Sequence, residues 1–196
     1  MDAIWGDAPP ERAANALQVY VHGLRKALGS DRVVTRGPGY ELRVEPEELD
    51  LHRFERLVAQ GAQALEEKDA ARAAAALRDA LALWRGAALG DLADEPFAGA
   101  ESARLEGLRL AALEQRIAAD LELGSHDHIG GELEGLIAEY PFRERLRCHQ
   151  VLALYRSGRQ ADALAAYQRA RQALVEELGI EPGPELQELE RRILQQ

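Results

Sequence analysis

Residues 32–44 read RVVTRGPGYELRV, and this stretch differs from the Ala- and Leu-rich sequence around it. Two runs that favour β-structure flank Gly37, Pro38 and Gly39. Because glycine adopts the positive φ of a tight turn and proline stiffens the backbone, the segment is typical of a β-hairpin. Arg36 stands at the tip, so we expect one short hairpin that presents a cation.

A helix is predicted directly before the hairpin, over residues 9–28. Pro10 suits its first turn, and Gly29 ends it. Apolar residues recur along it at steps of three and four, which predicts one apolar face. This stripe consists of Ala14, Leu17, Val21, Leu24 and Leu28. The other faces carry polar and basic side chains.

A helix with polar side chains that is followed at once by a hairpin with a cationic tip is typical of the second half of a winged helix-turn-helix. Such a helix enters the major groove of DNA, where amide and guanidinium groups meet base edges. Arg36 would enter the neighbouring minor groove, where the negative potential is strongest. From the residues alone, an ordinary surface helix and turn remain an alternative.

Composition limits the other functions of the 196-residue chain. Aromatic residues make up only 5% of a chain that is 46% hydrophobic, which suits close-packed helices. Residues 1–45 hold six basic and six acidic side chains, so the whole net charge of −10 falls in residues 46–196. This asymmetry predicts two modules with different partners. A single cysteine and the lack of a long apolar run favour a cytoplasmic, nucleoid-associated protein that does not enter a membrane.

The second module is expected to be helical throughout. Helices are predicted at 48–67, 70–85, 97–123, 127–139, 142–157, 160–178 and 184–195. Two of them share a small-large-small pattern, which lets a neighbouring helix approach closely. The pattern consists of Ala73, Leu77 and Ala80 in one helix and of Ala163, Tyr167 and Ala170 in the other. We therefore expect a tetratricopeptide-like array, with a plain helical bundle as the alternative.

Several segments resemble a known family. ANALQVYVHGLRKALG and VVTRGPGYEL resemble the recognition helix and wing of OmpR-type effector domains, and more closely those of the Streptomyces antibiotic regulatory protein family. DLHRFERLVAQGAQAL, ALALWRGAALGDLADEPF and the segments that follow resemble the bacterial transcriptional activator domain of that family. The resemblance implies a mainly α fold. A partial winged helix-turn-helix over residues 1–45 would precede a tetratricopeptide-like helical domain over 46–196.

The resemblance also implies a function. The chain would be a DNA-binding transcriptional activator of a biosynthetic gene cluster and not an enzyme. It would bind direct repeats in double-stranded promoter DNA and help RNA polymerase to engage, and self-association is a further expected contact. No cofactor is implied.

The site residues implied by the resemblance lie on the predicted helix and hairpin. Gln18, Val19 and His22 face the major groove, and Asn15 shares the polar side. Arg12, Arg25 and Lys26 are the expected phosphate contacts, and Arg36 is the arginine of the wing. Thr35 and Tyr40 would brace the wing, and Thr35 would also reach a phosphate. Gly23 departs from the family, where a basic or polar residue is common, and this removes one contact.

The first ten residues, MDAIWGDAPP, resemble the tail of the helix that precedes the recognition helix in the family. The sheet and helix that begin the family's effector domain have no counterpart in the sequence. The stripe Leu17, Val21, Leu24 and Leu28 would then have no sheet and helix to cover it. With the charge of −10, this motivates an alternative function: a helical-repeat interaction module with impaired or no DNA binding.

The other reactive residue types have structural explanations. Cys148 and His149 are sequence neighbours, so on a helix their side chains point about 100° apart, and a buried thiol is favoured over a nucleophile with its base. Two histidines flank Asp127, which is predicted as a helix N-cap rather than part of a metal site. Trp5 and Trp84 are expected in the core rather than as ligand-stacking residues. No catalytic or metal-binding residue is predicted.

Overall fold

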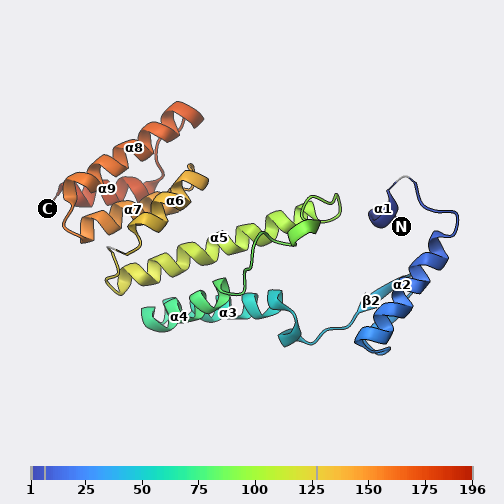
Figure 1. Ribbon diagram of the computed structural model, residues 1–196. Helices are drawn as coiled ribbons and strands as arrows, with labels where there is room; N and C mark the ends of the chain where they lie inside the picture. The colour runs from blue at the N-terminus through green and yellow to red at the C-terminus, as the bar shows by residue number, and fades with distance from the viewer. Residues whose placement is uncertain (1, 7, 127, 196) are drawn as a thin grey trace. The chain divides into compact units, whose positions relative to one another are not determined.

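The computed structural model describes residues 2–6, 8–126 and 128–195 (Figure 1). Apart from the short first helix α1 (Asp2–Trp5), its elements are α2 (Ala13–Leu28), β1 (Val33–Arg36), β2 (Gly39–Leu42), the 3-10 helix η1 (Pro46–Glu48), α3 (Asp50–Glu66), α4 (Ala70–Leu81), the 3-10 helix η2 (Gly90–Leu92), α5 (Gly99–Glu122), α6 (Gly130–Glu139), α7 (Glu144–Arg156), α8 (Gln160–Leu178) and α9 (Pro184–Leu194). The predicted mainly α fold with one hairpin is confirmed. None of the helices in the described ranges has both the length and the apolar character needed to cross a membrane.

Two compact units make up the chain. The first comprises Met1–Arg56 and Leu83–Leu108, and the second comprises Leu57–Ala82 and Arg109–Gln196. The two domains predicted from the sequence, residues 1–45 and 46–196, do not correspond to these compact units. They are defined by the family resemblance, and this division stays a prediction. Asp127, the predicted N-cap, lies outside the described residues.

The helix and hairpin of the first unit form where the sequence predicts them. The helix begins at Ala13 rather than at residue 9, because a turn precedes it in which the Ala13 amide donates to the Pro10 carbonyl at 2.9 Å. β1 and β2 pair antiparallel, with Thr35 opposite Tyr40. Gly37 has a φ of 52°, a conformation that suits glycine at the tip of the turn.

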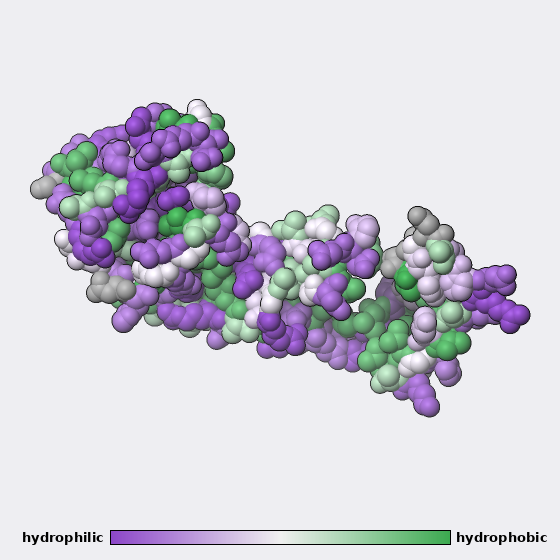
Figure 2. All heavy atoms as spheres, turned by 45° about the horizontal axis from the view of Figure 1, so that its top comes forward, coloured by the Kyte–Doolittle hydropathy of each residue, from purple (hydrophilic) through white to green (hydrophobic). Residues whose placement is uncertain are grey.

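The apolar stripe of α2 is only partly buried. Val21 is 5% exposed, whereas Leu24 and Leu28 are 50% and 52% exposed. Leu42 of the hairpin is also exposed. Figure 2 shows the corresponding hydrophobic surface on the part of the chain at the right, which contains α2 and the hairpin. The expectation of an uncovered stripe is therefore confirmed for Leu24 and Leu28 and is wrong for Val21.

The second unit has its core between helices that pack in sequence order. α7 packs against α6, α8 and α9. One group of buried side chains joins α5, α6 and α7, and a second joins α7, α8 and α9. The large side chains that are fully buried in these groups are Ile117, Leu121, Leu133, Leu146, Val151, Leu186 and Ile193. This stacking of neighbouring helices is the arrangement expected for helical repeats.

The small-large-small pattern lies in these contacts. Ala73, Leu77 and Ala80 are completely buried, and the matching residues of α8 are at most 4% exposed. A Cβ atom on Gly61 of α3 would lie 2.5 Å from Cγ of Leu77, so α3 and α4 pack too closely for any side chain at residue 61. The predicted close approach of helices is confirmed.

One helix ends earlier than predicted. α4 stops at Leu81 instead of continuing to residue 85. The chain then leaves the helix, and the ring of Trp84 packs edge-on against Phe54, with centroids 5.5 Å apart and an interplanar angle of 80°. This aromatic contact offsets the loss of the last helical turn.

Two buried carboxylates hold the helices of the second unit together. Glu114 of α5 is 1% exposed, and its two oxygens accept hydrogen bonds from Arg143 at 2.7 and 3.2 Å. Asp120 is 3% exposed and is paired with Arg116 at 3.0 Å and with Arg78. Because a buried charge is costly unless it is paired, these arginines are structural.

Candidate nucleic-acid interface

The polar face of α2 is open. Asn15, Gln18, Val19, His22 and Lys26 recur at helical spacing, so they share one face, and all five are exposed. The buried residues Ala13 and Val21 lie on the other side of the helix. Within the described part of the chain, no hydrogen bond or ion pair engages the four polar side chains of this face. We call these five residues the α2 polar face.

Arg25 ties the hairpin to α2. Its Nε donates to the backbone oxygen of Val33 at 2.8 Å, and its Nη2 donates to Oγ1 of Thr35 at 3.0 Å. The guanidinium also lies over the ring of Tyr40, 5.7 Å from the centroid, in a cation–π contact. Thr35 and Tyr40 therefore both contact Arg25, and their role in bracing a wing stays a prediction. The phosphate contact of Arg25 also remains a prediction.

Arg36 lies on the exposed end of the hairpin. Its side chain is 67% exposed, and its Nε is 2.8 Å from Oε2 of Glu41 on the opposite strand. Arg43 approaches the same carboxylate at 3.9 Å. An exposed pair of this kind is weak and is screened by salt, so a DNA phosphate can compete for the guanidinium. Arg36 is thus paired within its own hairpin and remains accessible.

Of the other basic residues near the hairpin, some are paired with a carboxylate of the chain and others are exposed without such a partner among the described residues. Arg12, the residue before α2, is exposed. Arg32 instead makes a bidentate pair with Glu48 of η1, and this pair holds the pKa of Glu48 below its ordinary value. Sequence reasoning did not assign Arg32 or Arg43 a role. A pattern of alternating strand residues cannot distinguish a cation that is paired within the protein from one that is free.

The other reactive groups do not form a site. Cys148 is 6% exposed, and burial raises the pKa of its thiol to about 12, so the thiol stays protonated. Burial lowers the pKa of His149. The expected structural role of Cys148 is therefore confirmed. In the ranges that the structure describes, no three His, Cys, Asp or Glu side chains are arranged to hold a metal ion.

Comparison with known proteins identifies the family. Residues 49–194 match the bacterial transcriptional activator domain. The regulatory protein DnrI of Streptomyces peucetius is 42% identical over 205 residues, which cover 99% of this chain and 75% of DnrI. The chain belongs to the Streptomyces antibiotic regulatory protein family. The family's named members are transcriptional regulators, which favours a regulator over a bare helical-repeat module.

Longer members share the same region. The regulatory protein AfsR of Streptomyces griseus is 44% identical over 194 residues, or 99% of this chain and 20% of AfsR. The solved structure of Mycobacterium tuberculosis EmbR in complex with a low affinity phosphopeptide is similar with a TM-score of 0.91 and 35% identity. This similarity covers 99% of the chain and 53% of the EmbR chain. The family member described here therefore spans about a fifth of AfsR and about half of EmbR.

Proposed function

We propose that this chain acts as a DNA-binding transcriptional activator. The α2 polar face would enter the major groove, and Arg36 would reach the adjacent minor groove. The observation that carries the proposal is the tie between the two elements: Arg25 holds the hairpin against α2 while the α2 polar face stays open. The family membership supports the same function.

The finer parts of the proposal concern the partners. Gln18 and His22 would contact base edges, and four cations would contact phosphates or the minor groove: Arg12, Arg25, Lys26 and Arg36. About four phosphate contacts by one copy correspond to a salt slope of only about −3.6, which suggests weak binding by a single chain. We therefore propose that two copies bind direct repeats in the promoter of a biosynthetic gene cluster.

The helical second module would then contact proteins instead of DNA. The net charge of −10 lies in residues 46–196, and this surface repels a phosphate backbone. We propose that this module contacts RNA polymerase and also the second copy of the chain on the adjacent repeat. Activity on the promoter would place the protein at the nucleoid.

Fluorescence-anisotropy titration tests the proposal. Labelled promoter DNA with tandem repeats is titrated with the chain at several salt concentrations and compared with a scrambled duplex. We expect salt-sensitive binding that prefers the repeats, and Arg36→Ala should weaken it and reduce the slope by about 0.9. Arg192→Ala, which removes an exposed cation of α9, is the matched control and should leave both unchanged. Equal binding to both duplexes, or the same loss in both variants, would contradict the proposal.

A further inference from the structure

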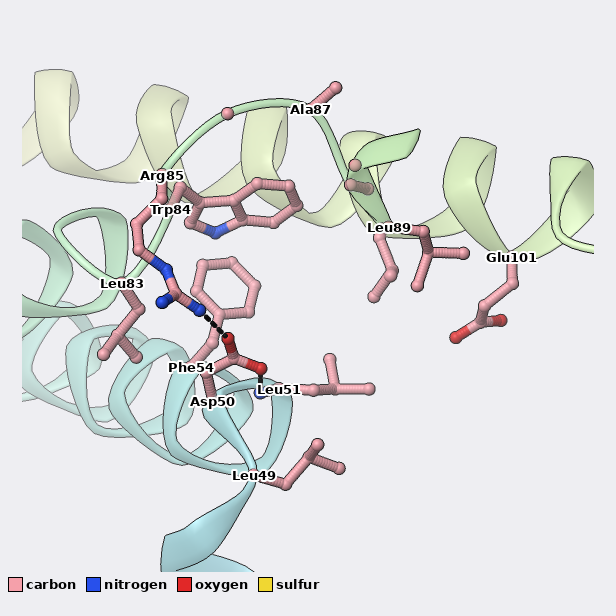
Figure 3. Close-up of a pocket in the computed structure, with 14 residues that line it drawn as sticks. Leu49, Asp50, Leu51, Phe54, Leu83, Trp84, Arg85, Ala87, Leu89 and Glu101 are labelled. Carbon is pink, nitrogen blue, oxygen red and sulfur yellow. Dashed lines mark hydrogen bonds and ion pairs between the residues drawn. The ribbon is translucent and has the colours of Figure 1, made fainter. Parts of the chain in front are cut away.

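The first unit contains a cavity that the proposed function does not use. It has a volume of about 490 Å³ and lies between the start of α3, the segment after α4 and the start of α5 (Figure 3). This volume is in the range of about 300–1,000 Å³ that is usual for small-molecule sites. We call it the Trp84 cavity, and its apolar lining consists mainly of Leu49, Leu51, Phe54, Leu83, Trp84, Leu89 and Leu105.

The inner wall of the Trp84 cavity is aromatic. Phe54 is 3% exposed and fixes the indole of Trp84 in an edge-on contact. Trp84 itself is only half-buried, and Figure 3 shows both rings beside Leu51 and Leu89. The sequence predicted Trp84 as a core residue. Its position at the edge of a cavity instead gives an apolar ring a surface on which to stack.

The segment over the cavity is held in place. The Ala88 amide donates to Glu106 of α5 at 2.7 Å, and the Ser102 hydroxyl donates to the Ala88 carbonyl at 3.4 Å. Leu89 adopts a left-handed conformation with a φ of 61°, which turns the chain into η2. Because α5 fixes this segment, the cavity is formed in advance, and a ligand need not order it.

The mouth holds one guanidinium with unused donors beside two carboxylates that already have partners. Arg85 is the cation among the described residues that line the cavity; its side chain is 87% exposed, and a 3.2 Å hydrogen bond links its Nη2 to Asp50. Glu101, one of the two carboxylates in the lining, is engaged by both Nε and Nη2 of Arg104, which lowers the pKa of Glu101. Asp50 also accepts from the Leu51 amide at 2.9 Å. Both carboxylates thus have partners, whereas the guanidinium of Arg85 has donors to spare.

We propose that the Trp84 cavity binds an amphipathic organic anion, with its ring system against Trp84 and Phe54 and its carboxylate or sulfonate on Arg85. A bidentate pair with a ligand oxyanion replaces the single exposed bond to Asp50. This site adds a small-molecule ligand to the proposed DNA-binding function. It rests on other residues and does not depend on that function.

Two probes with the same rings separate the apolar and the anionic parts of the site. 1-Anilinonaphthalene-8-sulfonate carries one sulfonate, and N-phenyl-1-naphthylamine carries none. The protein is the full chain with Trp5→Phe, which leaves Trp84 as its single tryptophan. Saturable energy transfer from Trp84 to the sulfonate probe is expected, with weaker binding of the neutral probe.

Arg85→Gln is the decisive variant, because an 87% exposed side chain can be replaced without disturbing the core. It should weaken binding of the sulfonate probe about tenfold and change the affinity for the neutral probe by less than about twofold, as expected for one charge-assisted contact. Arg53→Gln, at an exposed arginine of α3 outside the cavity lining, is the matched control and should change neither. Absence of saturable transfer from Trp84 would overturn the site. Equal binding of both probes, unchanged by Arg85→Gln, would overturn the anionic ligand.

Discussion

Nε of Arg25 on α2 lies 2.8 Å from the backbone oxygen of Val33 on β1. The same guanidinium bonds Thr35 and covers Tyr40, so one side chain contacts both strands of the hairpin. The orientation of the wing relative to the recognition helix therefore depends on Arg25.

Replacing Arg25 should loosen the hairpin. Arg25→Met keeps the aliphatic stem and removes the bonds to Val33 and Thr35, which should cost about 1 kcal/mol of local stability. Amide hydrogen exchange measures this: the amides of β1 and β2 should exchange about fivefold faster or more, while those of α8 should keep their rates. Unchanged exchange in the hairpin would show that the contacts of Arg25 do not hold it.

Substitutions on the α2 polar face should distinguish the residues that contact bases from those that contact phosphates. Gln18→Ala and His22→Ala should each cost about 1–3 kcal/mol on the preferred duplex and less on a scrambled one, with the salt slope unchanged. Lys26→Ala should weaken binding to both duplexes alike and reduce the slope by about 0.9. Anisotropy titrations at three salt concentrations distinguish the two patterns. The assignment fails if Gln18→Ala behaves like Lys26→Ala.

A side chain at residue 61 should destabilise the second unit. In Gly61→Ala the new Cβ would lie 2.5 Å from Leu77, so the core must shift, at a cost of about 1–3 kcal/mol. Gly107→Ala is the matched control, because residue 107 is also helical but exposed and has nothing within 4 Å of its Cβ. It should stabilise by about 0.5–1 kcal/mol through helix propensity. Urea unfolding measures both, and equal effects would contradict close packing of α3 on α4.

Removing the partner of a buried carboxylate should be costly. Arg143→Met leaves Glu114 buried, and we expect a loss of about 3 kcal/mol, at the low end for a broken buried pair because Arg143 is half-exposed. Arg104→Met breaks the exposed pair with Glu101 and should change stability by less than about 0.5 kcal/mol. Adding Glu114→Gln to Arg143→Met should restore part of the loss. Thermal unfolding that cannot tell the two arginine variants apart would contradict this.

His149 should make stability fall in mild acid. Burial holds its pKa below the unfolded value of about 6.5, so below that pH the unfolded chain binds a proton that the folded chain excludes. The stability that neutral His149 contributes is therefore fully present above about pH 6.5, and it is lost as the pH falls toward the pKa of His149 in the folded chain. His149→Gln should flatten the unfolding free energy between about pH 6.5 and 5 relative to the unchanged chain. His52→Gln, at an exposed residue, should leave that dependence unaltered.

Local patterns predicted most of the elements, and long-range contacts account for the differences. Gly37 and Gly39 mark the hairpin turn, and the alanine spacing of α4 marks its buried face. The bracing role of Arg25 depends on partners eight and ten residues away across a turn, which no periodic pattern reveals. Glu114 likewise looks like any other surface acid of an acidic chain. Its burial follows from the packing of α5 against distant residues. The early end of α4 likewise accompanies a long-range contact, that of Trp84 with Phe54.

The central claim is that α2 and the hairpin contact adjacent grooves, and cleavage of DNA from the hairpin tip tests it most directly. In Pro38→Cys the new thiol is exposed, whereas Cys148 is buried with a pKa raised to about 12, so an iron chelate can be attached at residue 38 alone. On promoter DNA with direct repeats, the account predicts cuts clustered at one position in each repeat, beside the major-groove site that Gln18 occupies. Cuts spread evenly along the duplex, or none at low salt, would contradict it.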